Sequence, residues 1–474
     1  MSLLQRTIHL LRKYRITPRK RLGQNFVVDE TLIRRMIMYA AISREDIVLE
    51  VGAGLGHLTR HLAKRCRRVL AVEIDPRLVR ALREQTCDLS NVEIIEGDIL
   101  KVSVPPFNKV VSTPPYSISS PLLFWLLDRK FDCAVLTFQR EFAQRLAAPI
   151  GSRDYGRVTV TTYYRAEVKL LDLVPREAFY PPPEVDSRIV YIEPRRTPPF
   201  RVENEKLFFD LVRILFTQRN RKVRNAVAPL LHTLGIPKEA VRIFADSLPF
   251  HDRRPRELSP EDFAHLSNEL AGRTSKHVFF RDCHLLVWRG VYEPAEDTYL
   301  IAENLDVEDG EEVLDMGTGC GILAILAAKK ASRVVAVDVN PRSVQCAEVN
   351  AWLNRVAQKV DVRVGSLFEP LRPDERFDLV LFNAPYLPTD TEPETMIGRS
   401  WSGGPTGREV IDSFIEGVAA HLKRRGRVLL VQSSLSNIDE TLRRFREKGF
   451  EAEVVAEKKV PFENIVLIRA ELRG

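Results

Sequence analysis

Residues 47–56 read IVLEVGAGLG and residues 312–321 read EVLDMGTGCG, and the expected architecture can be worked out from these two stretches. Each has an apolar run with one carboxylate inside it, Glu50 or Asp315, and each ends in a Gly-x-Gly-x-Gly turn. This pattern is typical of a buried strand that enters a turn where the backbone approaches a ligand, because a side chain there would collide with the ligand. The sequence therefore contains one ligand-binding unit twice.

The two turns are in register with a second acidic position. Gly52 and Gly317 are 265 positions apart, and so are Glu73 and Asp338, which end the next apolar runs, VLAVE and VVAVD. An acid at the end of the next strand, 21 positions after the turn, suits hydrogen bonds to the two hydroxyls of a ribose. A nicotinamide cofactor is an alternative, but Gly-x-Gly-x-Gly favours pyrophosphate less than Gly-x-Gly-x-x-Gly does.

Two further motifs in each half favour a methyltransferase cofactor, S-adenosylmethionine. A third apolar run closes with Gly97-Asp98 in the first half and with Gly365-Ser366 in the second, and both endings suit an adenine amino group. A fourth run ends in the tetrapeptides Thr113-Pro114-Pro115-Tyr116 and Asn383-Ala384-Pro385-Tyr386. A single proline-rich loop is common, but chance does not readily place two of them in order behind two glycine turns.

These tetrapeptides suit methylation of a planar nitrogen, either an adenine amine or a glutamine amide. The lone pair of such a nitrogen is delocalised, and accepting hydrogen bonds from both of its N–H groups favours a pyramidal, more nucleophilic form. The first side chain and the second carbonyl supply the two acceptors, the proline stiffens the turn, and the aromatic ring stacks on the flat group. No metal is required. The predicted catalytic residues are Thr113, Pro114, Tyr116, Asn383, Ala384 and Tyr386.

Charge divides the chain unevenly. Residues 1–270 contain 44 Lys and Arg against 32 Asp and Glu, for a net charge of +12, whereas residues 271–474 contain 27 against 32, for a net charge of −5. A basic surplus of this size attracts phosphate backbones, although solvated surfaces without a partner are an alternative explanation.

Length and composition set the remaining limits. A chain of 474 residues with 45% hydrophobic residues is expected to form two or three domains. The apolar runs are too short for a membrane span and the N-terminus does not resemble a signal peptide, so we expect a soluble cytoplasmic protein. The six cysteines are scattered without partners at metal-ligand spacing, which predicts free thiols and no metal site.

The first half resembles a known family. The run RLGQNF at residues 21–26 is followed by EVGAGLG, EIDPRL, GDIL, YGRVTV and FYPPPEVDSRIV. In order and spacing these motifs resemble the small-subunit ribosomal RNA adenine dimethyltransferases, the KsgA family, over residues 10–270. The resemblance implies double N6-methylation of two adjacent adenosines near the 3′ end of that RNA, with the RNA or a pre-ribosomal subunit as partner.

This resemblance also implies site residues. The cofactor contacts would be Gln24 and Asn25 at its methionine end, Gly52 and Gly54 at its backbone cradle, Glu73 at its ribose and Asp98 at its adenine. Tyr116 would stack on the target base. Phe179 is a candidate for the opposite face of the base, although an aromatic residue before prolines is often a packing residue.

One departure from the family affects the catalytic tetrapeptide. The family has asparagine and leucine where this chain has Thr113 and Pro114. A threonine hydroxyl can accept a hydrogen bond, but it is shorter than an amide and also donates. An alternative is therefore that the first half binds ribosomal RNA and cofactor as an assembly factor without transferring methyl groups.

Two basic clusters are candidates for RNA contact. The first is the arm Arg12, Lys13, Arg15, Arg19, Lys20 and Arg21; the second is Arg219, Arg221, Lys222 and Arg224, along a helix predicted after the catalytic core. Both clusters could bind phosphates, or they could be solvated charged faces. Helical periodicity over residues 200–270, broken near Gly235 and Pro237, predicts a small helical domain.

The second half resembles another family. The motifs YEPAEDT at residues 292–298, LDMGTGCG, NAPY and SWSGGPTGREVID resemble the HemK glutamine methyltransferases, especially their archaeal and eukaryotic branch, over residues 278–474. The resemblance implies N5-methylation of the glutamine in the Gly-Gly-Gln loop of a class I release factor. It also implies, as an expectation, a small zinc-binding activator subunit as partner.

The second half keeps the amide at Asn383, and Ala384 replaces the usual proline at a position that acts through its carbonyl. Here the cofactor contacts would be Gly317, Gly319, Asp338 and Ser366, and Tyr386 would stack on the amide. Glu296 and Thr298 could equally be helix-starting residues. An alternative substrate is a nucleic-acid base, which the acidic balance disfavours.

Together these observations predict an α/β chain. We expect two Rossmann-like class I methyltransferase domains, each with a seven-stranded, mostly parallel sheet, and a small all-helical domain between them. The expected boundaries are 1–195 for the first catalytic domain, 196–270 for the helical domain, 271–277 for a link and 278–474 for the second catalytic domain.

Overall fold

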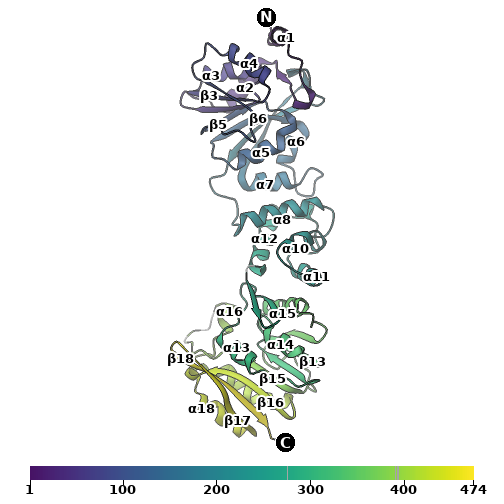
Figure 1. The fold of residues 1–474 in the computed structure, drawn as a ribbon, viewed down its shortest axis with the longest axis vertical. Coiled ribbons are helices and arrows are strands. Elements are labelled where there is room, and N and C mark those ends of the chain that lie inside the picture. Colours follow the sequence, from purple (N-terminus) through teal and green to yellow (C-terminus); the bar gives the residue numbers. More distant parts are fainter. Residues whose placement is uncertain (275, 390, 392–393, 474) are drawn as a thin grey trace. The chain divides into compact units, whose positions relative to one another are not determined.

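The chain forms two compact units, each with one large sheet (Figure 1). The computed structural model describes residues 1–274, 276–389, 391 and 394–473. Unit 1 comprises Met1–Arg221 and Arg253–Ala264, and unit 2 comprises Lys222–Asp252 and His265–Gly474. Among the described residues, no helix has both the length and the apolar character that crossing a membrane requires.

The sheet of unit 1 has seven strands in the order β4-β3-β2-β5-β6-β9-β7. β2 to β6 are parallel, and β9 runs antiparallel to both of its neighbours. A separate short pair is formed by β1 and β8. The strands are β1 (Phe26–Val27), β2 (Ile47–Val51), β3 (Arg68–Glu73), β4 (Val92–Glu96), β5 (Lys109–Ser112), β6 (Cys133–Gln139), β7 (Ala166–Val174), β8 (Phe179–Tyr180) and β9 (Ser187–Pro194).

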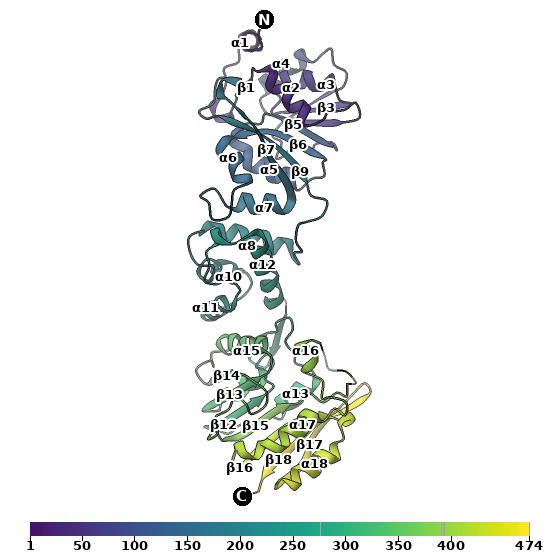
Figure 2. The same ribbon diagram turned by 180° about the vertical axis from the view of Figure 1, so that it is seen from behind.

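Helices cover both faces of this sheet (Figures 1 and 2). Successive strand residues point to opposite faces, so Val48 packs with α2 (Glu30–Tyr39) and α3 (His57–Ala63), while Leu49 packs with α5 (Ser119–Leu127) and α6 (Arg140–Leu146). The other helices of this unit are α1 (Leu3–Lys13), α4 (Pro76–Gln85), α7 (Arg157–Arg165) and α8 (Glu205–Thr217), with 3-10 turns at Lys20–Leu22, Tyr116–Ile118, Arg176–Ala178 and Pro255–Glu257.

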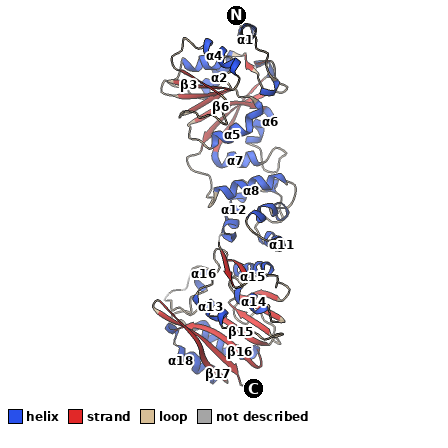
Figure 3. Cartoon of the chain, viewed as in Figure 1, coloured by secondary structure: helices blue, strands red, loops and turns tan. Residues whose placement is uncertain are grey.

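The sheet of unit 2, whose strands are red in Figure 3, repeats this topology, with the order β14-β13-β12-β15-β16-β18-β17. β18 is antiparallel to both of its neighbours, and the other pairs are parallel. The strands are β12 (Glu312–Met316), β13 (Arg333–Asp338), β14 (Val360–Val364), β15 (Phe377–Asn383), β16 (Leu422–Ser433), β17 (Phe450–Val460) and β18 (Glu463–Leu472), and a hairpin of β10 (His277–Phe280) and β11 (Cys283–Leu286) precedes them. The predicted pair of seven-stranded, mostly parallel sheets is confirmed.

The helices of unit 2 lie around this sheet and in the segment before it. They are α9 (Val223–Ala226), α10 (Ala228–Thr233), α11 (Lys238–Ser247), α13 (Glu296–Glu303), α14 (Ile322–Ala328), α15 (Pro341–Leu353), α16 (Met396–Arg399), α17 (Glu409–Val418) and α18 (Ile438–Glu447), with 3-10 turns at Ala419–His421 and Ser434–Ser436.

Both glycine turns lead directly into a helix. Gly56 and Gly321 have φ angles of +79° and +89° and begin α3 and α14. A Cβ atom on Gly56 would lie 2.8 Å from the Leu82 side chain, and one on Gly321 would lie 3.0 Å from Ala347 Cβ. The last glycine of each turn thus allows both the left-handed backbone and the close packing of the next helix.

The segment before the second sheet is helical, as expected. Gly235, with a φ of +83°, follows the C-cap of α10, and Pro237 is the N-cap of α11. The expected link over residues 271–277 begins inside α12 (Pro260–Thr274), a helix that contributes residues to both units. The Arg273 side chain is buried and donates to the Ser247 carbonyl, which holds this end of the helix. The domain boundaries stay a prediction.

Candidate active sites

A cavity of about 240 Å³ lies at the carboxyl ends of β2 to β5 in unit 1. These strands are neighbours and parallel, so the turns that follow them meet at one edge of the sheet. Seven of the residues expected at the first site line this cavity: Gln24, Asn25, Gly52, Gly54, Glu73, Asp98 and Thr113. Pro115 and Ser117 also line it, whereas Pro114 and Tyr116 do not.

The Glu73 carboxylate is buried and held by the backbone. One oxygen accepts a hydrogen bond from the Gly54 N–H at 2.9 Å, and the other accepts from the Asp75 N–H at 2.9 Å. Burial raises the pKa of Glu73, although these amides oppose the shift. Each oxygen keeps a lone pair for a further donor, which suits paired hydroxyls.

The Thr-Pro-Pro-Tyr turn is fixed between the glycine turn and the N-terminal arm. The Ser112 hydroxyl, just before Thr113, accepts a hydrogen bond from the Val51 N–H at 3.1 Å. A Cβ atom on Gly52 would lie 3.0 Å from Pro115, and one on Gly23 would lie 3.2 Å from it. Glycine at 52 therefore makes room for the tetrapeptide as well as for a ligand.

The two aromatic rings predicted around the target base do not face each other. Tyr116 and Phe179 meet edge to face, with ring centroids 6.5 Å apart and an interplanar angle of 79°. Phe179 is only 3% exposed and packs in the core, and the Tyr116 hydroxyl bonds to Ser187. The role of Phe179 at the base stays a prediction, because in this structure its ring serves as a packing residue.

The second basic cluster does not lie along one helix, which corrects the sequence interpretation. α8 ends at Thr217, Arg219 and Arg221 lie in the turn after it, and α9 begins after Lys222. The last apolar side chain of α8 is Phe216, and residues 217–222 offer no apolar side chain to continue the packing.

Most of these basic side chains already have partners within their own unit. Arg219 donates to the backbone carbonyls of Ser152 and Arg153, and both Lys222 and Arg224 pair with Asp252. In contrast, all six residues of the N-terminal arm are exposed, although Lys13 pairs with Glu84: Arg12, Lys13, Arg15, Arg19, Lys20 and Arg21. Arg21 also lines the cavity, so the arm is the better-placed cationic surface.

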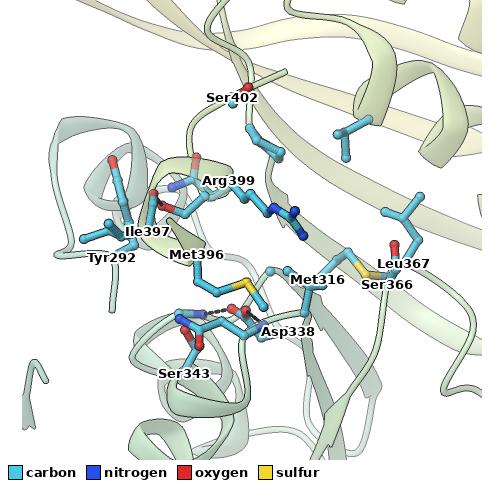
Figure 4. A pocket seen from close by; sticks show the side chains of 18 of the residues that line it. Tyr292, Met316, Asp338, Ser343, Ser366, Leu367, Met396, Ile397, Arg399 and Ser402 are labelled. Carbon is cyan, nitrogen blue, oxygen red and sulfur yellow. Dashed lines mark hydrogen bonds between the residues drawn. The ribbon is translucent and has the colours of Figure 1, made fainter. Parts of the chain in front are cut away.

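Unit 2 has a larger cavity, of about 500 Å³, at the corresponding sheet edge (Figure 4). The expected residues Gly317, Gly319, Asp338, Ser366 and Asn383 line it. Asp338 repeats the geometry of its counterpart in unit 1: one oxygen accepts from the Gly319 N–H at 2.9 Å and the other from the Asn340 N–H at 2.8 Å. Burial raises the pKa of Asp338.

A neighbouring cavity of about 400 Å³ is lined by three of the four residues of the second tetrapeptide. Ala384 and Tyr386 line this cavity, and Asn383 lines both cavities. The Asn383 amide nitrogen donates to the Thr298 hydroxyl at 3.1 Å. Its Oδ1 is buried and, in the described part of the chain, has no hydrogen-bond partner. An unused acceptor thus sits where a cofactor cavity meets a second opening.

Several lining residues were missed by sequence reasoning. Ile74 and Val339 follow the two ribose-type acids, are 44% and 43% exposed, and line the two cofactor cavities. Their equal spacing of 265 positions could have revealed them. Met396 and Arg399 extend into the cavity of unit 2 from α16 (Figure 4). They belong to none of the motifs that repeat at a spacing of 265 positions, so the sequence did not point to them.

Glu50 and Asp315, the carboxylates just before the two glycine turns, are also buried. Each has one oxygen without a hydrogen-bond partner in the described part of the chain. Burial raises the pKa of Glu50 to about 8 and the pKa of Asp315 to about 7.

We expect Glu50 to make unit 1 less stable as pH rises. Its folded pKa lies above the unfolded value, so the folded state keeps a proton that the unfolded state releases between about pH 4.5 and pH 8. Stability should fall through this window by up to about 1.4 kcal/mol per pH unit. Urea unfolding of the full chain at several pH values checks this: Glu50→Gln should flatten the dependence, and an unchanged slope would contradict it.

Comparisons with known proteins match the two parts separately. Residues 16–240 match the family described as ribosomal RNA adenine dimethylase, and residues 293–460 match the family described as methyltransferase small domain. A probable ribosomal RNA small subunit methyltransferase A from Methanosarcina acetivorans is 44% identical over 249 residues, which cover 52% of this chain and 91% of that protein.

Two solved structures are also similar. A dimethyladenosine transferase from Plasmodium falciparum is 29% identical, with a TM-score of 0.45, over 52% of this chain and 96% of that chain. The E. cuniculi Mtq2–Trm112 complex, responsible for methylation of the eRF1 translation termination factor, is 26% identical, with a TM-score of 0.32, over 39% of this chain and 99% of that chain.

Proposed function

We propose that the N-terminal half, which belongs to the ribosomal RNA adenine dimethylase family, dimethylates N6 of two adjacent adenosines near the 3′ end of small-subunit ribosomal RNA. The chain is an S-adenosylmethionine-dependent methyltransferase, and its second part is a small methyltransferase domain. We further propose that the protein acts in the cytoplasm.

The residues of unit 1 fit S-adenosylmethionine, which when bound supplies an electrophilic methyl group on its sulfonium. The glycine turn leaves a cradle without side chains, and Glu73 keeps lone pairs for ribose hydroxyls. We assign the methionine end of the cofactor to Gln24 and Asn25, and its adenine to Asp98. Asp98 Oδ1 accepts a hydrogen bond from the Leu100 N–H at 3.0 Å, which fixes the turn at this residue.

For the target base, we assign one acceptor to the Thr113 hydroxyl and the other to the Pro114 carbonyl. Tyr116 would stack on the base, and its phenol, with a pKa raised to about 12 by burial, stays neutral. The exposed N-terminal arm would bind RNA phosphates, with Arg221 as a further contact.

A labelled-methyl assay with immature small ribosomal subunits tests this activity. The full chain should place label in small-subunit RNA as dimethyladenosine, and Tyr116→Ala should reduce incorporation by about 10- to 100-fold, because base stacking is lost. Tyr163→Ala is the matched control, since Tyr163 is a 39% exposed tyrosine that does not line the cavity.

The second candidate for this half is an assembly factor that binds RNA and cofactor without catalysis. The short hydroxyl of Thr113 and the burial of Phe179 favour it. Binding of the subunit by the wild type without any incorporation of label would support this candidate and contradict the enzyme.

For the second half we propose N5-methylation of the glutamine in the Gly-Gly-Gln loop of a class I release factor. The observation that carries this proposal is the unpaired Asn383 Oδ1 between the two cavities. A glutamine amide nitrogen entering from the second cavity could donate one N–H to Asn383 and the other to the carbonyl of Ala384. Gly317, Gly319, Asp338 and Ser366 would hold the cofactor.

The competing substrate is a nucleic-acid base, and charge argues against it. The segment 271–474 has a net charge of −5, and Glu296 and Glu463 line the second cavity, so phosphates would be repelled. Incubating the full chain with release factor and with RNA separately tests the assignment. Label on the release-factor glutamine is expected, and an RNA-only signal that Asn383→Ala removes would overturn it.

We also propose that a small zinc-binding activator subunit covers part of the second domain. Support comes from two exposed apolar side chains: Val364, the last residue of the edge strand β14, is 51% exposed, and Trp352, in α15, is 47% exposed.

A further inference from the structure

A buried hydrogen-bonded relay leads from the start of α13 to the second tetrapeptide. Asp297 and Thr298 are each 4% exposed. The Thr298 hydroxyl donates to Asp297 Oδ1 at 3.1 Å and accepts from the Asn383 amide nitrogen at 3.1 Å. α13 begins at Glu296, so Glu296 and Thr298 do lie in the first turn of a helix, the alternative that the sequence left open, and Thr298 makes these buried contacts in addition.

The same carboxylate also holds two tyrosines. Asp297 Oδ2 accepts from the Tyr292 hydroxyl at 2.8 Å and from the Tyr386 hydroxyl at 3.1 Å. Burial and the neighbouring Asp297 raise the pKa of both phenols, so both remain protonated donors. The first and the fourth residues of the tetrapeptide are therefore connected to one carboxylate.

This relay determines which end of the Asn383 amide faces the cavities. A carboxylate only accepts hydrogen bonds, so the Thr298 hydroxyl must use its one proton to donate to Asp297. The Thr298 oxygen can then only accept, and it selects the NH₂ end of Asn383. If the amide were reversed, two oxygens would face each other without a proton between them.

We propose that Asp297 and Thr298 are positioning residues that hold Asn383 Oδ1 toward the substrate nitrogen. Without the relay the amide would rotate and present NH₂, a donor, to a substrate group that also donates. This inference rests on the proposed methylation of a planar nitrogen by the second half, and it assigns a role to the motif at residues 292–298 that goes beyond starting a helix.

The test compares Thr298→Val with Thr298→Ser in the full chain. Valine keeps the shape and removes the hydroxyl, and serine keeps the hydroxyl. Thr298→Val should lower kcat of the second activity about five- to tenfold, with KM for the release factor and cofactor binding unchanged, because one orienting hydrogen bond is lost. Thr298→Ser should restore kcat to near wild type.

A double-mutant comparison separates positioning from general stability. In an Asn383→Ala background, Thr298→Val should cause no further loss, because no amide remains to be oriented. An equal further loss, an equal defect in Thr298→Ser, or no effect of Thr298→Val on kcat would each overturn the proposal.

A second readout does not depend on the substrate. The full chain is labelled at asparagine, and the side-chain NH₂ protons of Asn383 are assigned by their absence in Asn383→Ala. These protons should exchange slowly with solvent in the wild type. They should exchange faster in Thr298→Val. Rapid exchange in the wild type would refute the relay. If protection is seen but no release factor is methylated, the proposed function fails while the relay stands.

Discussion

Asn383→Ala should lower kcat for methylation by the second half by about 10²- to 10³-fold, which is the usual cost of removing one aligned polar group from a transition state. Asn383 Oδ1 has no protein partner in the described part of the chain, so alanine removes an acceptor that only a substrate would use. Gly317, Gly319 and Asp338 remain, so binding of S-adenosylmethionine should be nearly unchanged. Labelled-methyl transfer to the release factor measures the loss.

Calorimetry on the same variant shows whether Asn383 is structural. The full chain should bind two molecules of S-adenosylmethionine, and Asn383→Ala should still bind two. Asn383→Gln, which keeps the amide but displaces it by one methylene, should lose most of the activity as well. If Asn383→Ala bound only one molecule of S-adenosylmethionine, Asn383 would be needed for cofactor binding, which would contradict a role directed at the substrate.

Trp288→Ala should lower the free energy of unfolding of unit 2 by about 3–5 kcal/mol, the usual cost of truncating a buried aromatic side chain. Trp288 is 1% exposed. Phe244 of α11 meets it edge to face with centroids 5.9 Å apart, and the Arg273 guanidinium of α12 lies 4.4 Å from its ring centre. Phe244→Ala should destabilise the same unit by a similar mechanism.

Hydrogen exchange followed by mass spectrometry locates the effect. Both variants should speed exchange in residues 277–473 and leave residues 1–221 largely unchanged. Phe279→Ala, in the same hairpin region but 72% exposed, should change stability by less than about 0.5 kcal/mol. Faster exchange confined to residues 196–270 after Phe244→Ala would instead favour a separate helical domain.

The cofactor sites could largely be located from the sequence. Glycine turns, acids and tetrapeptides recur at constant spacing, and each follows an apolar run. Parallel strands end at one edge of a sheet, so residues such as Gly52 and Glu73, or Gly317 and Asp338, had to meet there once the strands were recognised. Local periodicity and composition carry this information.

Other features depend on packing between distant segments. Thr298 contacts Asn383 across 85 positions, and nothing local to either residue specifies which end of the amide faces the cavity. Phe179 looked available for a base, but the core that forms around it buries its ring. Arg273 lies in the expected link over residues 271–277, but its side chain packs against Trp288 and donates to Ser247.

Sequence by itself thus determined the two α/β folds, their cofactor edges and the kinds of residue that surround each site. Tertiary structure alone decided which acceptor is left unpaired, which aromatic rings are buried and which helices belong to the second unit. The physical reason is that strand order follows from periodicity and chain connectivity, whereas hydrogen-bond direction and burial depend on side chains brought together from separate segments.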